Sequence, residues 1–283
     1  MSAPPTAPPR PTGTAPAAGA APRRPPTWVT RPLTLLGLPA VLVGIWWVAG
    51  ADSTDPFYPP LATILDAFGR VWFSERFFLD VLPSLRRFAV GLLLAVVVGV
   101  GAGLLIGSSR VLRTLLEPAL AFFRALPAPV LVPVLLVVVG VGDAMKIAVI
   151  AFGCLWPVLL NTVDGVRGTD DVQLDTARVS GLSRTAVFGH LVLPSASPQI
   201  AAGIRQALGI GIILMVVSEM VVSTDGLGHA VVRFQRSFAL PEMWSGMIFL
   251  GLLGFLLAKA LEVVERRALA WHHGLRRATG DRS

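Results

Sequence analysis

The chain has 283 residues, of which 54% are hydrophobic and only 14% are charged. Soluble domains carry about 25% charged residues, so this composition excludes a disordered protein and argues against an ordinary soluble enzyme. The mean hydropathy of +0.70 predicts an all-α polytopic membrane protein, because each membrane-spanning helix needs roughly 20 apolar residues. The formal charge of +7 is carried by Arg residues at the ends of apolar runs, which indicates membrane topology rather than nucleic-acid binding.

The chain begins with a Pro/Ala-rich stretch, residues 1–31, which predicts a disordered cytoplasmic tail. A transmembrane domain is expected over residues 32–271, and a basic cytoplasmic tail over 272–283. Six spans are predicted within the domain, at residues 33–50, 88–107, 115–142, 144–162, 198–222 and 244–261. Between the first two spans, residues 61–73 are expected to form a short helix on the outer surface.

Two of these spans carry residues that predict their geometry. In the second span, glycines recur at four-residue spacing, which suits close contact with another helix: Gly99, Gly103 and Gly107. In the third span, prolines are expected to break or kink the helix: Pro127, Pro129 and Pro133.

The distribution of Lys and Arg predicts the orientation of the spans. When both termini are placed inside, seventeen of the 24 Lys and Arg residues lie on the cytoplasmic side and seven on the outer side. Arg86 and Arg87 are exceptions, since they fall at the outer end of the second span. Lys146, Arg233 and Arg236 also lie outside, where they could attract an anion or meet lipid headgroups.

Three polar residues within the fifth span are candidates for lining a pathway. Glu219 is the strongest, because carboxylates within a membrane are costly and often functional. The alternative is a paired or snorkelling residue near the outer interface. Ser218 and Gln206 could line a pathway or could serve helix packing.

Motifs for the common catalytic chemistries are missing from the sequence. The two lysines, Lys146 and Lys259, follow Met145 and Ala258, so neither belongs to a phosphate-binding loop. The sequence also lacks a His-Glu-x-x-His zinc motif and a Gly-x-Ser-x-Gly nucleophile elbow. We therefore expect no catalytic residue, metal site or cofactor, although an intramembrane enzyme remains an alternative.

The longest polar stretch between predicted spans, residues 164–194, has the signals of two short helices. The first is expected over about 171–179 and ends at Gly181 in the left-handed conformation. Its N-cap is Thr169 or Asp170. Ser183 would cap a second helix that ends before Pro194. This helix–turn–helix is either a connector lying on the protein's own helices or a docking element for a soluble partner.

The stretch contains residues in a characteristic order: Asp175, Thr176, Ala177, Gly181, Phe188, Leu193 and Pro194. Further matches flank it: Ser84-Leu-Arg-Arg87, Arg124-Ala-Leu-Pro127, Gly140-Val-Gly142, Asn161-Thr162, Gly226-Leu-Gly228 and Glu265-Arg-Arg267. Over roughly residues 58–271 the chain resembles the permease subunits of ATP-binding-cassette importers, and within them the nitrate, sulfonate and taurine permeases. Residues 164–194 correspond to the EAA loop of that family.

The resemblance implies a type I importer permease bundle (MetI-like) in the cell membrane, surrounded by lipid, with both termini cytoplasmic. It implies three protein partners: a second copy of the chain, a cytoplasmic ATPase dimer and an extracytoplasmic substrate-binding protein. The seven residues of the loop would couple to the ATPase, with Asp175 in place of the family's Glu. The substrate would be a small anion such as a sulfonate, taurine or nitrate, or alternatively a heterocyclic vitamin or pyrimidine precursor. A secondary transporter working alone is the rival reading.

Overall fold

The computed structural model describes the backbone of residues 27–268 and the side chains of residues 37–268. Over this range the chain forms helices and no strands. The proposed tail at 272–283 and most of the tail at 1–31 lie outside the described residues. Helix α1 (Thr27–Gly50) contains the predicted first span and belongs to a separate unit from the rest of the chain.

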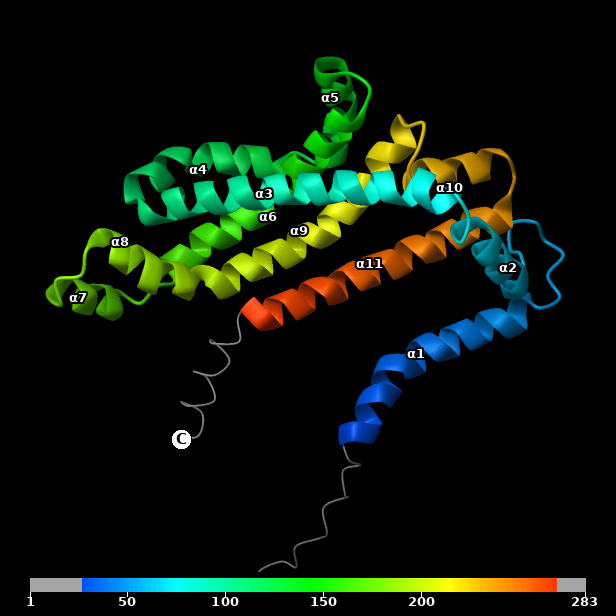
Figure 1. Ribbon diagram of the computed structural model, residues 1–283, viewed down its shortest axis with the longest axis horizontal. Helices are drawn as coiled ribbons and strands as arrows, with labels where there is room; N and C mark the ends of the chain where they lie inside the picture. Colours follow the sequence, from blue (N-terminus) through cyan, green and yellow to red (C-terminus); the bar gives the residue numbers. More distant parts are fainter. Residues whose placement is uncertain (1–26, 269–283) are drawn as a thin grey trace, which may run out of the picture. The chain divides into compact units, whose positions relative to one another are not determined.

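The second unit holds the remaining helices, which Figure 1 shows along the chain. They are α2 (Leu61–Trp72), a π-helical turn (Phe77–Val81), α3 (Leu82–Ser108), α4 (Arg110–Ala125), a 3₁₀ turn (Ala128–Val130), α5 (Leu131–Val139), α6 (Asp143–Arg167), α7 (Asp171–Val179), α8 (Arg184–Val187), a second π-helical turn (Phe188–Val192), α9 (Leu193–Val221), α10 (Leu227–Arg236) and α11 (Leu240–Ala268).

Four continuous helices in the described range are long and apolar enough to cross a membrane, at Phe77–Ser108, Asp143–Arg167, Arg184–Val221 and Leu240–Ala268. The bent pair formed by α4 and α5 raises the number to as many as five. The predicted second, fourth, fifth and sixth spans fall inside the four continuous helices. The apolar stretch Gly37–Gly50 of α1 is shorter than these four.

Helices α3 and α6 pack against each other through glycines, as the four-residue spacing predicts. A Cβ atom placed on Gly99 would lie 2.9 Å from Val158 Cγ1, and one on Gly103 would lie 2.6 Å from Thr162 Cβ. The contacts advance in the same direction along both helices, so α3 and α6 run parallel. The two backbones can approach this closely only because α3 has no side chain at these positions.

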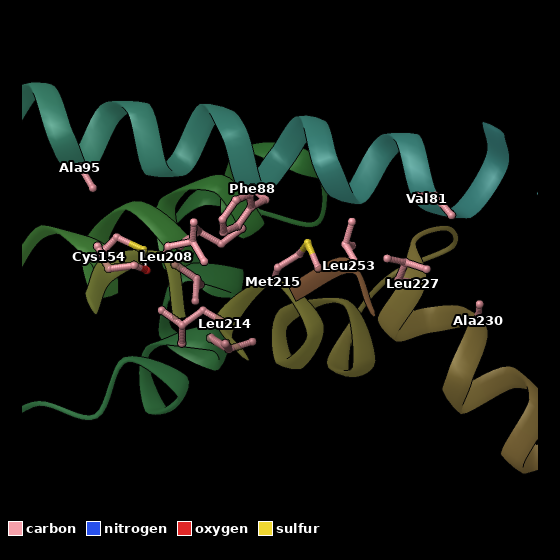
Figure 2. Close-up of a cluster of buried hydrophobic side chains, with 14 of the residues drawn as sticks. Val81, Phe88, Ala95, Cys154, Leu208, Leu214, Met215, Leu227, Ala230 and Leu253 are labelled. Carbon is pink, nitrogen blue, oxygen red and sulfur yellow. Dashed lines mark hydrogen bonds between the residues drawn. The ribbon is translucent and has the colours of Figure 1, made fainter. Parts of the chain in front are cut away.

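The core of the second unit lies between α3, α6 and α9. Figure 2 shows Phe88 of α3 beside Cys154 of α6 and Leu208 and Met215 of α9. Cys154, the single cysteine of the chain, is fully buried and its thiol donates to the Ala207 carbonyl at 3.2 Å. This side chain therefore packs within the core, with no route for a reagent in water.

The third predicted span is broken, as its prolines predict. Helices α4 and α5 meet at an angle of 74°, and Figure 1 shows α5 turning away from the line of α4. Leu126, which precedes Pro127, has the extended backbone that a following proline favours (φ −72°, ψ 120°). Pro127 and Pro129 also lack the N–H groups that a continuous helix would use here.

The second loop helix does not end before Pro194, so that prediction was wrong. Helix α8, the π-helical turn at Phe188–Val192 and α9 form one continuous helix, Arg184–Val221. In the turn, the Leu193 N–H bonds to the carbonyl of Phe188, five residues back. This wider turn makes room for the Pro194 ring, which would otherwise meet the preceding helical turn.

Candidate functional sites at the two ends of the bundle

The helix–turn–helix segment (residues 170–187) is held together by local hydrogen bonds. The Asp170 carboxylate accepts from the Val172 N–H at 2.9 Å and caps α7, while the Ser183 hydroxyl accepts from the Ala186 N–H at 3.2 Å and caps α8. Gly181 has φ +71° in the turn between them, a left-handed value that other residues adopt only with strain. The first predicted helix, the turn at Gly181 and the two caps, Asp170 and Ser183, are therefore confirmed.

The predicted coupling residues of α7 differ in exposure. Asp175 is exposed and pairs with Arg178 one turn away, with 2.7 Å between Nη1 and Oδ1. The exposed Thr176 hydroxyl donates to the Val172 carbonyl at 2.7 Å. Ala177 is buried. The turn presents apolar side chains to the surroundings as well, since Val179 is 90% exposed.

The other predicted coupling residues lie beyond the turn, along the continuous helix. Phe188 lines a cavity of about 590 Å³ together with Leu174 and Leu182. The ends of α3 and α6 line the same cavity. Leu193 and Pro194 line a different cavity, of about 650 Å³, between α9 and the end of α11. Of the seven predicted coupling residues, Ala177 is buried and Pro194 is half-buried, whereas the other five are exposed.

At the opposite end of α3, α6 and α9 lies an ionic cluster formed by Arg87, Asp143, Lys146, Glu219 and Asp225. The Arg87 guanidinium is 2% exposed and donates to three carboxylates from different segments. Its distances are 2.6 Å to Asp143 Oδ1, 3.0 Å to Glu219 Oε1 and 2.5 Å to Asp225 Oδ1. Lys146 lies 3.9 Å from Asp225 Oδ1 and donates to the Ser223 hydroxyl at 2.7 Å.

Glu219 is 1% exposed, and hydrogen bonds satisfy its carboxylate. Besides Arg87, it accepts from the Ser84 hydroxyl at 2.7 Å and from the Gly228 N–H at 3.0 Å. Ser84 Oγ in turn accepts from the Leu227 N–H at 2.8 Å. A Cβ atom on Gly228 would lie 2.9 Å from Glu219 Cβ, so a glycine is needed for the α10 N-terminus to approach.

The cluster is close to neutral in formal charge. Arg86 also pairs with Asp143, so Arg86, Arg87 and Lys146 face three carboxylates. Burial of charged groups is tolerated only when each is paired and hydrogen-bonded. These side chains therefore satisfy one another, and Lys146 is not free to attract an anion.

The two other pathway candidates have different surroundings. Ser218 is fully buried, and its hydroxyl donates to the Met215 carbonyl at 3.0 Å within α9. Gln206 is exposed, and its Oε1 accepts from Asn161 Nδ2 of α6 at 3.1 Å. The three candidates thus lie at separate places along α9, and only Glu219 belongs to the ionic cluster.

Arg87 is the residue whose role the sequence did not reveal. Its pairing with Glu219 joins positions 132 residues apart. The sequence held one indication of this role: the pair Arg86-Arg87 falls at the outer end of the second span, on the side of the membrane where Lys and Arg are less frequent. Positive charges in such a place need partners, and the carboxylates of three neighbouring segments supply them.

Neither end of the bundle forms a metal site: within residues 27–268, His, Cys, Asp and Glu side chains do not gather in groups that could hold an ion. One end presents an exposed, internally capped helix–turn–helix, and the other ties three segments together through buried charge. This arrangement suits a protein that contacts a partner at one end and moves as a unit.

Known proteins share this sequence and fold. Residues 95–268 match the family model described as the binding-protein-dependent transport system inner membrane component. The taurine transport system permease protein TauC of Escherichia coli is 30% identical, over 86% of this chain and 92% of its own length. A Bacillus subtilis chain named as an aliphatic sulfonates transport permease protein, SsuC, is 31% identical, over 83% of this chain and 86% of its own.

Among solved structures, the MetNI methionine ABC transporter contains a chain with a TM-score of 0.57 to this one. The match covers 66% of this chain and 94% of that chain, at 19% identity, and shows a shared fold. Importers of this class work with an ATPase and a substrate-binding protein, and their permeases are transport subunits rather than enzymes. The chain belongs to the family of multi-pass inner-membrane permease subunits of ATP-binding-cassette importers.

Proposed function

We propose that this chain forms the translocation pathway of an importer for a small anion, as a homodimer with a separate ATPase beneath it. Coupling to the ATPase is supported by the exposed helix–turn–helix segment, because this segment continues directly into the membrane helix Arg184–Val221. The substrate class follows from relatives named for taurine and aliphatic sulfonates, and nitrate belongs to the same expectation. Both termini lie in the cytoplasm in this proposal.

In the proposed mechanism, ATP binding closes the two ATPase subunits and draws the two helix–turn–helix segments together. Asp175 contacts a basic group of the ATPase, and Phe188, Leu193 and Pro194 pass the displacement to α9. The helices then change from an inward-facing to an outward-facing arrangement, and hydrolysis resets them. The energy is supplied by the partner, and this chain converts it into a rigid-body movement.

Asp175→Lys and Gly181→Pro test the coupling. Asp175 is exposed and pairs only with the exposed Arg178, so reversal of its charge leaves the fold intact. Proline cannot adopt the φ of +71° at position 181, so Gly181→Pro changes the direction of the turn. Both variants are expected to reach the membrane in normal amounts and to lose substrate-stimulated ATPase activity and uptake.

The matched control is Arg178→Ala, which removes the partner of Asp175 within the chain and leaves its carboxylate free for the ATPase. It should retain transport. Normal transport by Asp175→Lys or Gly181→Pro would overturn the coupling assignment.

A mild-detergent pull-down of the tagged chain, followed by uptake measurements in liposomes, tests the partners and the substrate. A stoichiometric ATPase and a binding protein that takes up taurine, an alkanesulfonate or nitrate would support the proposal. A binding protein specific for a heterocyclic vitamin or pyrimidine precursor would replace the substrate class. Ion-driven uptake in vesicles without ATP would instead indicate a secondary transporter.

A further inference from the structure

Helices α4 and α6 line a cavity of about 400 Å³ that carries charged side chains. The charged side chains that line it are Arg113, Glu117 and Arg124 from α4 and Asp164 and Arg167 from α6. Ile106, Leu120, Ala121, Leu160 and Val163 complete the lining. Charged residues inside membrane segments face a water-filled space or a partner. The α4–α6 cavity is therefore expected to hold water.

The cavity extends towards the middle of the bundle. Arg124 lines it with Leu160, which lies about 10 Å along α6 from Arg167. Beyond Arg124, a Cβ atom on Gly153 would lie 3.1 Å from Ala128 Cβ, at the break between α4 and α5. Gly153 lies about 15 Å along the axis from Asp143 and about 21 Å from Arg167. The break is thus near the midpoint of the spanning helices.

Irregular backbone at this depth restricts what can surround it. Pro127 and Pro129 are exposed, so the described residues of the second unit do not cover the break. Lipid cannot satisfy the backbone groups that a broken helix leaves open, whereas water in a cavity or another protein surface can. The break and the α4–α6 cavity are adjacent along α4, and a continuous wet surface accounts for both.

Arg124 is the deepest charge of this surface and has no side-chain partner among the described residues. Arg167 pairs with Asp164 at 3.8 Å, but Arg124 makes neither an ion pair nor a side-chain hydrogen bond with any described residue. The basic side chains Arg87 and Lys146, near the other end of the bundle, are occupied by the ionic cluster. A planar guanidinium with free donors suits the oxygens of a sulfonate or nitrate group.

We propose that the α4–α6 cavity is the inner half of the translocation pathway and that Arg124 is the residue that receives the anion there. The proposal rests on the function proposed above and assigns the specificity-determining charge. Leu120 and Ala121 would border the route with apolar surface, and the anion would leave towards the Arg113 and Arg167 end. The α4 helix (Arg110–Ala125) has no buried residue, so substitution of Arg124 leaves the core unchanged.

Thiol labelling tests the cavity without knowledge of the substrate. The single native thiol, Cys154, is fully buried, so the wild type provides a blank. Ala121→Cys, in the complete complex in liposomes, should react with the anionic reagent methanethiosulfonate ethylsulfonate faster than with its trimethylammonium counterpart, each rate taken relative to free cysteine. Arg124→Gln in the same chain should reduce this preference about fivefold, because a fixed positive charge concentrates anions.

The control is Phe122→Cys, since Phe122 is adjacent and 62% exposed but does not line the cavity. It should stay unreactive because lipid covers it. An unreactive Ala121→Cys, or an unchanged preference with Arg124→Gln, would overturn the proposal. So would labelling that occurs in phosphatidylcholine but is blocked by added phosphatidylglycerol, since a lipid headgroup would then occupy the cavity.

A transport assay is the second test of this proposal. In the complex with ATPase and binding protein, Arg124→Gln should lower the taurine carried per ATP hydrolysed at least tenfold, with partial recovery in Arg124→Lys. Arg110→Gln, on the same helix but outside the cavity, should behave as the wild type. Equal transport by Arg124→Gln would contradict the assignment. A wild-type complex without ATP-driven uptake, but with the expected labelling, would refute the proposed function and leave the cavity assignment standing.

Discussion

Arg87 binds three carboxylates that come from three different segments, so its loss leaves the buried Glu219 and two partly exposed carboxylates without this cation. Arg87→Met keeps the volume of the side chain but leaves Glu219 and Asp225 without their main cation. Removal of one partner from a buried ion pair costs about 3–5 kcal/mol. We expect a large fall in the thermal unfolding temperature of the purified protein in detergent.

Arg86→Met is the matched control, because Arg86 pairs with the same Asp143 from an exposed position. Exposed ion pairs contribute about 0–1 kcal/mol, so this variant should unfold close to the wild type. Equal unfolding temperatures for the two variants would show that the ionic cluster does not hold the segments together.

Gly103 marks the closest approach of α3 and α6. The Cβ atom of Gly103→Val would lie 2.6 Å from Thr162 Cβ and 2.9 Å from the Leu159 carbonyl oxygen, too close for either helix to stay in place. Overpacking of this kind costs about 1–3 kcal/mol. Gly101→Val places the same side chain on a face of α3 with open space around it. A thermal melt should show destabilisation for Gly103→Val alone, and equal loss in both would contradict the packing.

At the level of single residues, the sequence predicted which positions were unusual but not their partners. Glu219 stood out because a carboxylate in an apolar run is costly, and paired burial was one of the two readings. Arg87 and Gly228, which complete its surroundings, could not be assigned because they come from other helices. Spacing along one helix gives no information about such contacts.

At the scale of the element, two N-caps define the helix–turn–helix segment. Asp170→Ala and Ser183→Ala each remove the side-chain acceptor of a helix N-terminus, at a cost of about 1 kcal/mol. The segment should then open more often and be cut faster by trypsin after Arg178 or Arg184. Ser180→Ala is the control, because the Ser180 hydroxyl makes no hydrogen bond with a described residue. Equal digestion rates in all three variants would contradict the role of the caps.

The elements themselves were largely readable from the sequence. Capping residues, the glycine turn and apolar runs placed α2 and α7 within one residue, whereas the predicted spans in α6 and α11 are shorter than the helices. Pro194 misled because a proline usually interrupts a helix, whereas here the preceding turn widens to accept its ring. The break near Pro127 was expected, but its angle of 74° depends on the contacts of Ala128 with other helices.

For the molecule as a whole, the proposed orientation predicts which side of the membrane each end reaches. Glu75→Cys and Val179→Cys lie at exposed positions near opposite ends of the spanning helices, in a chain whose native thiol is buried. In right-side-out membrane vesicles, an impermeant maleimide should label Glu75→Cys directly and Val179→Cys only after permeabilisation. The wild-type chain is the blank. The reverse pattern would invert the topology and place the helix–turn–helix segment outside, away from any ATPase.

The class of the whole molecule followed from composition, since so much apolar surface needs lipid around it. The arrangement of the helices did not, because parallel packing of α3 on α6 depends on glycines meeting residues about 59 positions later in the chain. The α4–α6 cavity was equally hidden. Arg124 reads in sequence as one of many positive charges near a span end, and only the fold places it in a cavity with residues of α6.

Because helix Arg184–Val221 is continuous, a movement at one of its ends would be transmitted to the other. Its 38 residues extend about 57 Å, from the helix–turn–helix segment to the Glu219 carboxylate. A tilt of only about 5° at one end would displace the other by about 5 Å, roughly one helical turn. Glu219 is tied to α3 and α10 at that far end, so these segments would have to travel with it. In the proposed mechanism, a small closure of the ATPase would thereby produce a movement as large as a small anion.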